Sequence, residues 1–169
     1  EYRKLSPNLS LSEANNNLEE SVLRPKKASF SFRFETFRRF ESSLEEIFSP
    51  SAASVILYTS ASKCGRDACK KTTRRTKTKK EALLYLSMMK RWENWGKLSF
   101  ETVDLENGTG KIIVVNSFET IAYRSNQPCC HFLRGFLAGF LSELFAKEIS
   151  VDEEKCAGKG DEYCEFTFA

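Results

Sequence analysis

The clearest hydrophobic pattern lies near the C-terminal end of the chain. Over residues 130–148 apolar side chains occupy most positions, and Phe132, Phe136 and Phe140 recur four residues apart. This pattern predicts a helix that is buried on all sides. Two strand-like stretches, 151–155 and 163–168, follow on either side of a glycine-rich turn and predict a β-hairpin.

The middle of the chain predicts a second hairpin and a helix. Residues 98–105 and 111–117 are strand-like, and Asn107-Gly108 between them favours a tight turn. The apolar run 112–115 predicts a central strand covered by helices. Residues 118–123 fit either a strand or a loop. An amphipathic helix is expected over 81–93, with one apolar face formed by Ala82, Tyr85, Leu86, Met89 and Trp92.

The first third of the chain changes period. Alternating phenylalanines predict a strand over 29–35, and three-and-four spacing then predicts a helix from Thr36 that ends at Ser49-Pro50. The apolar face of that helix is formed by Phe37, Phe40, Leu44, Ile47 and Phe48. Residues 55–58 fit a buried strand or the start of a helix. Residues 1–28 are polar and predict a partly ordered extension ahead of one domain, 29–169.

Small residues recur at helical spacing in two places. Ala61, Cys64, Gly65 and Ala68 fall in one helical stretch, and Gly135 and Gly139 fall in the apolar C-terminal helix. Glycine weakens a helix interior by about 1 kcal/mol relative to alanine. The two glycines therefore indicate a groove that a neighbouring helix or a bound molecule approaches closely.

Charge narrows the partners. The net charge is only +3, which does not favour nucleic acid. Seven of the eleven residues 70–80 are Lys or Arg. They could bind phosphate, but no aromatic side chain interrupts them to stack on bases, so a solvated segment is favoured.

The apolar run 132–145 is shorter than the ~20 residues of a membrane span, so we expect no span and a cytoplasmic protein. In a reducing compartment spaced cysteines more often bind metal or react than form disulfides.

Four residues near the C-terminus form a candidate zinc site. Cys156 and Cys164 flank the glycine-rich turn, Glu153 lies three residues before Cys156, and Cys130 begins the apolar helix. Three thiolates and one carboxylate complete a tetrahedral set with no open position, which is typical of structural zinc. Cys129 or His131 could replace Cys130, and buried free thiols or a disulfide are the rival interpretations.

These residues also carry a resemblance to the 4-vinyl reductase domain family. It covers roughly residues 29–168 and rests mainly on residues 130–140 (CHFLRGFLAGF), Glu153-x-x-Cys156 and Gly160-Asp161-x-x-Cys164-x-Phe166. Trp95-Gly96 and Asn116-Ser117-Phe118-Glu119 are also similar to that family. The resemblance implies an α/β ligand-binding module related to the sensor domains of phenol- and toluene-responsive activators. In those sensors three cysteines and a glutamate hold zinc, which maps onto Cys130, Glu153, Cys156 and Cys164. Distantly similar vesicle-tethering subunits hold a fatty acyl chain.

Together these patterns predict a mixed α+β fold, in which an antiparallel sheet packs against several helices and zinc pins the last helix to the last hairpin. We expect a domain that binds a small hydrophobic or aromatic ligand. The candidate ligand residues are aromatic, and each could equally fill a core: Tyr85, Trp92, Tyr123, Phe132, Phe136 and Phe140.

Two alternatives are a homodimeric interaction scaffold and a reductase-related protein of tetrapyrrole metabolism. The family sensors also imply a dimer for a binding domain. The sequence has no glycine-rich dinucleotide loop and no evident acid–base pair, which favours binding over catalysis.

Overall fold

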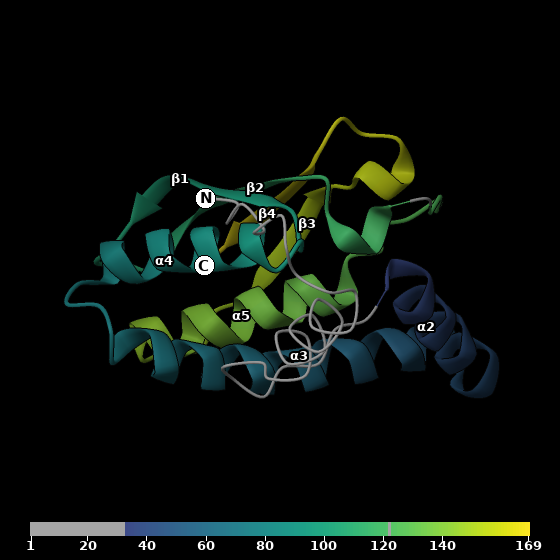
Figure 1. Ribbon diagram of the computed structural model, residues 1–169, viewed down its shortest axis with the longest axis horizontal. Helices are drawn as coiled ribbons and strands as arrows, with labels where there is room; N and C mark the ends of the chain where they lie inside the picture. The colour runs from purple at the N-terminus through teal and green to yellow at the C-terminus, as the bar shows by residue number, and fades with distance from the viewer. Residues whose placement is uncertain (1–32, 122) are drawn as a thin grey trace, which may run out of the picture. The chain divides into compact units, whose positions relative to one another are not determined.

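The computed structural model describes residues 33–121 and 123–169, in which helices and an antiparallel sheet alternate (Figure 1). The predicted mixed α+β fold is confirmed. The expected extension 1–28 lies outside the described residues, and the compact unit that the structure does describe is Phe34–Ala169. In chain order the elements are α2 (Phe34–Phe48), α3 (Pro50–Thr73), α4 (Lys79–Trp92), β1 (Lys97–Asp104), β2 (Thr109–Val115), η1 (Phe118–Thr120), α5 (His131–Phe145), β3 (Val151–Lys155), η2 (Ala157–Lys159) and β4 (Cys164–Phe168).

Both predicted hairpins are present in one sheet of order β1-β2-β4-β3. All three strand pairs are antiparallel, and Ile112 of β2 lies opposite Phe100 of β1 and Phe166 of β4. The central position of β2 is therefore confirmed. Ile112 and Val114 are fully buried, whereas Val115 remains 39% exposed. The two faces of β2 are thus unequally covered, contrary to the expectation from its continuous apolar run.

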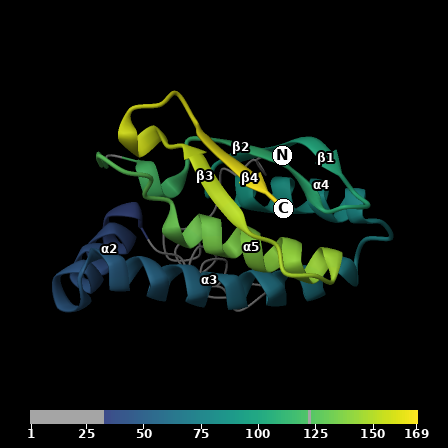
Figure 2. The same cartoon turned by 180° about the vertical axis from the view of Figure 1, so that it is seen from behind.

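The predicted C-terminal helix is α5, which packs along α3 (Figures 1 and 2). Glycines make this close approach possible. A Cβ atom on Gly135 would overlap the backbone of Tyr58, and one on Gly139 would overlap the backbone of Ser62. In return, Gly65 of α3 faces the backbone of α5. The predicted groove is therefore filled by a neighbouring helix. Residues 55–58, left open as strand or helix, lie within α3.

Helix α4 begins where Thr78 accepts a hydrogen bond from the backbone N–H of Glu81 at 3.1 Å. Ala82, Leu83 and Leu86 are buried, as the amphipathic pattern predicts. The placement of Trp92 on the buried face is wrong, because that side chain is 79% exposed at the end of the helix.

Two residues after the end of α4 sit in the left-handed region, Asn94 (φ 60°) and Gly96 (φ 127°). The chain reverses there, and Trp95 between them packs against the core.

The predicted strand over 29–35 is wrong where it can be compared. Residues 29–32 lie outside the described residues, and Phe34 and Glu35 begin α2. The predicted apolar face of α2 is also wrong in part: Phe40, Ile47 and Phe48 are at least half exposed. The helix turns inward instead through Phe37, whose ring lies 5.1 Å from that of Phe118, and through the buried side chain of Glu41.

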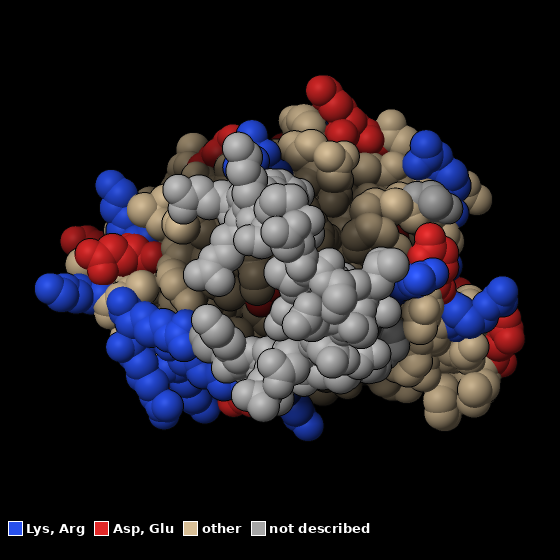
Figure 3. All heavy atoms as spheres, in the orientation of Figure 1, with Lys and Arg blue, Asp and Glu red and all other residues tan. Residues whose placement is uncertain are grey.

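The basic segment between α3 and α4 has the solvated character that the sequence favours. Its seven Lys and Arg side chains are all exposed. Figure 3 shows Lys and Arg gathered at the lower left, where α3 ends in Figure 1. No helix among residues 33–121 and 123–169 combines the length and the apolar character that crossing a membrane requires.

Candidate functional site

Cys130, Glu153, Cys156 and Cys164 converge at one end of α5; we call them the metal group. One potential ligand atom from each lies within 4.8 Å of all the others. The sulfur atoms come from three separate places: the N-cap of α5, the residue that follows β3, and the first residue of β4. All three thiols are buried and free, and Glu153 is half-buried.

The geometry of the metal group fits a tetrahedral ion. The Sγ atoms of Cys130 and Cys164 are 3.6 Å apart. Two thiolates bound to one zinc ion at 2.3 Å would lie about 3.8 Å apart.

Glu153 supplies a second sign of fit. Its Oε2 accepts the backbone N–H of Cys130 at 3.0 Å, whereas its Oε1 is buried without a hydrogen-bond partner among the described residues. Coordination to a cation would satisfy that oxygen.

The turn between β3 and β4 is built to hold the two cysteines that flank it. The carboxylate of Asp161 accepts the backbone N–H of Cys156 at 2.8 Å, and Gly160 closes the turn with φ 110°. The backbone N–H of Ala157 donates to the sulfur of Cys164 at 3.4 Å. A Cβ on Gly158 would lie 2.6 Å from the sulfur of Cys129, so glycine is required there. The turn therefore serves the thiols as well as the hairpin.

Burial and mutual hydrogen bonds set the charge of the metal group. Hydrogen bonds from Cys129, Cys130 and Cys164 lower the pKa of Cys156, and hydrogen bonding with Cys129 and its neighbours raises the pKa of Cys130. Burial raises the pKa of Glu153 to about 8. One negative charge thus gathers on Cys156. A bound cation would favour the ionised form of every member, because metal ligands must be deprotonated.

The two alternative ligands lie beside the metal group. The sulfur of Cys129 is 3.5 Å from that of Cys156, close enough to exchange a hydrogen bond. His131 is partly buried as the first residue of α5, and burial lowers its pKa. The geometric grouping contains Cys130 and neither Cys129 nor His131.

An aromatic cluster, which we define by its rings, lies over the first turns of α5. Phe132 lies 5.5 Å from Phe37 and 5.7 Å from Trp95, and Phe136 lies 4.9 Å from Trp95. The tilted and edge-to-face angles are those that aromatic pairs prefer. The members of the aromatic cluster are Phe37, Trp95, Phe118, Phe132 and Phe136. The structure therefore brings Phe132 and Phe136 together, and Phe140 stacks on Phe136 at 6.4 Å.

The three other candidate ligand residues make different contacts. Arg75 donates to the hydroxyl of the partly buried Tyr85 at 2.8 Å. The guanidinium of Arg38 lies 3.4 Å from the ring centroid of Tyr123. Trp92 is exposed, and Trp95 takes the position in the aromatic cluster that the sequence suggested for it.

Lys90 is a member of this region that the sequence analysis missed. It is 6% exposed, and its Nζ lies 3.6 Å from the Trp95 ring centroid and 2.6 Å from a carboxylate oxygen of Glu93. Burial lowers its pKa. Lys90 thus places a cation against the aromatic cluster. Its spacing of four residues from Leu86 was the available signal for an inward position.

Glu119 is a second missed residue. Its carboxylate accepts the backbone N–H groups of Phe132 at 2.9 Å and Leu133 at 2.7 Å, and so caps the first turn of α5. Burial, and then the nearby charge of Glu41, raise its pKa well above the usual value. The sequence holds no local signal for this cap, because the acceptor precedes the helix by a whole loop.

Part of the chain matches a known family. Residues 111–169, which include the metal group, match the family model of the 4-vinyl reductase domain. The predicted resemblance to that family is thereby confirmed.

Curated relatives match over short segments only. The uncharacterized protein MJ0150 of Methanocaldococcus jannaschii is 51% identical over 37 residues, which are 22% of this chain and 21% of that protein. MJ1642 of the same organism is 42% identical over 40 residues, 24% of this chain and 25% of that protein. The matches thus span about a quarter or less of these relatives.

Solved structures share the fold over most of their length. The phenol-responsive sensory domain of the transcription activator PoxR, solved with phenol, has a TM-score of 0.76 at 18% identity, covering 95% of this chain and 90% of that one. A vinyl-4-reductase family protein from Methanocaldococcus jannaschii has a TM-score of 0.59 at 20% identity, covering 98% of both chains.

A third neighbour is a trafficking protein particle complex subunit 3 from Naegleria fowleri, covalently bound to palmitic acid. Its TM-score is 0.61 at 10% identity, covering 80% of this chain and 90% of that one. At these identities the likeness concerns the fold.

Proposed function

We propose that this chain is a sensory ligand-binding domain that holds a structural zinc ion in the metal group and takes a small aromatic or hydrophobic molecule at the aromatic cluster. One observation carries the proposal: three buried thiols and an unpartnered carboxylate oxygen converge at the first turn of α5, the helix that also supplies Phe132 and Phe136. The PoxR sensory domain, a structural neighbour, was solved with phenol, which supports an aromatic ligand.

The metal group would act as a clamp. Four protein ligands leave no position open for a substrate, so the ion would contribute folding energy, on the order of 10 kcal/mol of apparent binding free energy in small zinc domains. Cys130 would hold the start of α5, while Cys156 and Cys164 hold the β3–β4 turn. The clamp would therefore fix the end of α5 that presents the aromatic cluster.

The aromatic cluster would supply the apolar surface and Lys90 the polar contact. Its rings touch one another, so a ligand would have to displace a side chain and replace its edge-to-face contacts. The buried ammonium of Lys90 lies beside Trp95 and Phe136. It could donate a hydrogen bond to the oxygen of a phenol or of a fatty acid.

Metal content tests the first half of the proposal. Protein prepared without added zinc should contain one zinc ion per chain by elemental mass spectrometry. Cys156→Ser and Cys164→Ser should each lose it. Cys64→Ser is the matched control, since Cys64 is an exposed thiol on α3 outside the metal group, and it should keep the ion. A zinc content near zero in the unmodified protein would contradict the clamp.

Ligand binding tests the second half. Phenol, toluene and palmitate should each be assayed for a rise in melting temperature and for a bound mass in native mass spectrometry. We expect at least one to bind, and Phe136→Ala to weaken that binding. Leu84→Ala, at an exposed position of α4, should not. Failure of all three probes with zinc-loaded protein would remove the ligand half and leave the metal half intact.

A second candidate function rests on exposed apolar side chains. Ile47 is 71% exposed, Phe48 54% and Val55 64%, all near the junction of α2 and α3. Such a patch is typical of an interaction surface and favours the homodimeric scaffold. Light scattering over a range of concentrations would test it. A dimer that Ile47→Asp converts to a monomer supports the scaffold, and a monomer at every concentration removes it.

A further inference from the structure

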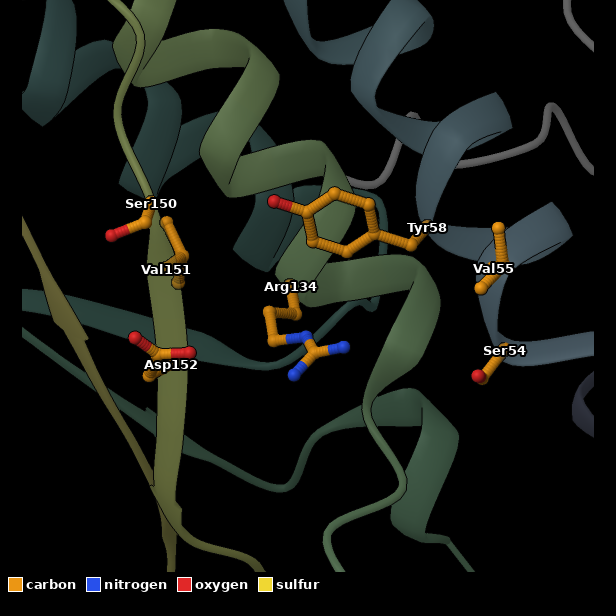
Figure 4. Close-up of a pocket in the computed structure, with 7 residues that line it drawn as sticks. All are labelled: Ser54, Val55, Tyr58, Arg134, Ser150, Val151 and Asp152. Carbon is orange, nitrogen blue, oxygen red and sulfur yellow. The ribbon is translucent and has the colours of Figure 1, made fainter. Parts of the chain in front are cut away.

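A second cavity, distinct from the aromatic cluster, lies between α3, α5 and β3. Its volume is about 250 Å³. Figure 4 shows Arg134 reaching from α5 and Asp152 from β3 into the same space, with Tyr58 of α3 across from them. The lining residues are Ser54, Val55, Tyr58, Arg134, Ser150, Val151 and Asp152. None of them belongs to the metal group.

Arg134 is an incompletely satisfied donor at this cavity. Its Nε atom is buried without a hydrogen-bond partner among the described residues, and its guanidinium carbon lies 5.2 Å from the Tyr58 ring centroid. A buried unpaired donor costs about 1–3 kcal/mol. A carboxylate is the natural partner, because its two oxygens match the fork of a guanidinium.

Asp152 supplies the opposite charge. It lines the same cavity on the exposed side of β3, and no ion pair joins it to Arg134 within 4.0 Å in the described part of the chain. Both charges act on the space between them. Burial raises the pKa of the Tyr58 hydroxyl, while Arg134 lowers it and Asp152 raises it. A lone anion at Arg134 would be repelled by Asp152, whereas a molecule that carries both charges would be attracted at each end.

The remaining wall is suited to an apolar group. Val151 is buried, Val55 is exposed at the cavity rim, and the ring of Tyr58 is partly buried. The hydroxyl of Ser54 already donates to the carbonyl of Ser51 at 2.8 Å, so toward a ligand it can only accept. An acceptor there suits an ammonium group better than a second carboxylate.

From this arrangement we propose that the cavity binds a small zwitterion of the amino-acid class. The carboxylate pairs with Arg134, the ammonium with Asp152, and the side chain lies against Tyr58, Val55 and Val151. This site is independent of the proposed function at the aromatic cluster. The order of the charges also sets its selectivity, because an acid without the amine, or an amine without the acid, loses one of the two partners.

The test is a titration of the full chain with each of the twenty common amino acids, followed by nuclear magnetic resonance and calorimetry. We expect at least one to bind with a dissociation constant on the order of 1 mM, as suits a small and rather open site. The N-acetyl and amide derivatives of the best binder, which lack the ammonium and the carboxylate respectively, should each bind more weakly. Failure of all twenty to bind would overturn the proposal.

Two variants decide the chemistry. Arg134→Gln should weaken binding by roughly 10- to 100-fold, the loss expected for a charged hydrogen-bonded pair. Asp152→Asn should weaken it in the same direction. If Asp152→Asn instead tightens binding, the site holds a simple anion and the zwitterion proposal is wrong.

Controls separate binding from folding. Lys71→Gln, which removes an exposed cation of α3 outside the cavity, should bind like the unmodified protein. Arg134→Gln and Asp152→Asn must keep the metal content and the circular-dichroism spectrum of the unmodified chain. Because Asp152 is exposed, its variant remains informative even if Arg134→Gln folds poorly.

Discussion

Two acidic residues, Glu41 and Glu119, are buried side by side between α2 and the start of α5. They are 2% and 3% exposed. Glu119 accepts two helix N–H groups, which stabilise its charged form, and Arg38 donates to Glu41 at 3.1 Å. Burial nevertheless dominates and raises the pKa of Glu41 to about 6. Two adjacent buried carboxyls resist carrying two charges, so the folded protein retains a proton there.

Replacing Glu41 should change how stability depends on pH. Because its pKa is raised from 4.5 to about 6, the folded chain holds a proton that the unfolded chain releases. The resulting stabilisation is complete below pH 4.5 and is lost as the pH rises through 6. Glu41→Gln cannot lose this proton. Above pH 6 the variant should therefore be more stable than the unmodified protein, by on the order of 2 kcal/mol.

Urea unfolding at a series of pH values measures this difference. Glu45→Gln, a change at a less buried acid of the same helix, should alter stability by less than about 0.5 kcal/mol. Unfolding free energies of Glu41→Gln and the unmodified protein that stay parallel from pH 4.5 to 7 would show that Glu41 does not hold the proton.

At the residue scale, sequence reasoning succeeded where partners are near in the chain. Cys156 and Cys164 flank one turn, so their convergence follows from the hairpin. Glu119, Lys90 and Arg134 were missed as site residues. A cap contributed from an earlier loop, a cation over an aromatic ring and a cavity wall depend on tertiary packing that no local spacing records.

At the element scale, the contact between α3 and α5 depends on glycine. Gly139→Ala tests it because two effects have opposite signs. Alanine favours an isolated helix by about 1 kcal/mol over glycine. The new Cβ, however, would overlap the carbonyl oxygen of Ser62 in α3, and a backbone atom cannot turn aside. We expect the clash to prevail and the variant to lose about 3 kcal/mol of unfolding free energy, at the upper end of overpacking costs.

Thermal and urea unfolding both report this loss. Gly160→Ala is a control, since a Cβ there meets nothing within 4 Å and the cost comes only from φ 110°. That strain should cost about 1–2 kcal/mol. If Gly139→Ala is neutral or stabilising, the two helices do not approach as closely as described.

Elements with strong, continuous periodicity were predicted well: α4, α5 and both hairpins follow from the sequence. Helix α2 was not, because three alternating phenylalanines suggested a strand that would include Phe34. Its orientation also escaped prediction. One ring, Phe37, packs against η1 and α5, while apolar neighbours stay outside. Counting apolar residues on a face cannot show which part of that face finds a partner.

At the scale of the whole described domain, α5 connects its parts. It packs along α3 on one side and contacts β3 of the sheet on the other (Figures 1 and 2). Its N-terminus meets the metal group, the cap from Glu119 and the aromatic cluster within two turns. That end therefore depends on ligands drawn from distant segments, whereas the middle of α5 is held by continuous burial between Leu133 and Ser142.

This division predicts a local response to removal of the metal. Chelation of the zinc-loaded protein should increase hydrogen exchange most at the first turn of α5 and at the β3–β4 turn, because both would lose their shared ion. Amides in the middle of α5 should stay protected longer, since packing against α3 does not involve the metal group. The melting temperature should fall by many degrees, in keeping with the large folding energy of structural zinc. Cys164→Ser should reproduce the exchange pattern of the chelated protein and show no further change when chelator is added. A variant that still responds fully to chelator would place the ion elsewhere, and a uniform rise in exchange would show that the ion supports the whole domain instead of one end of α5.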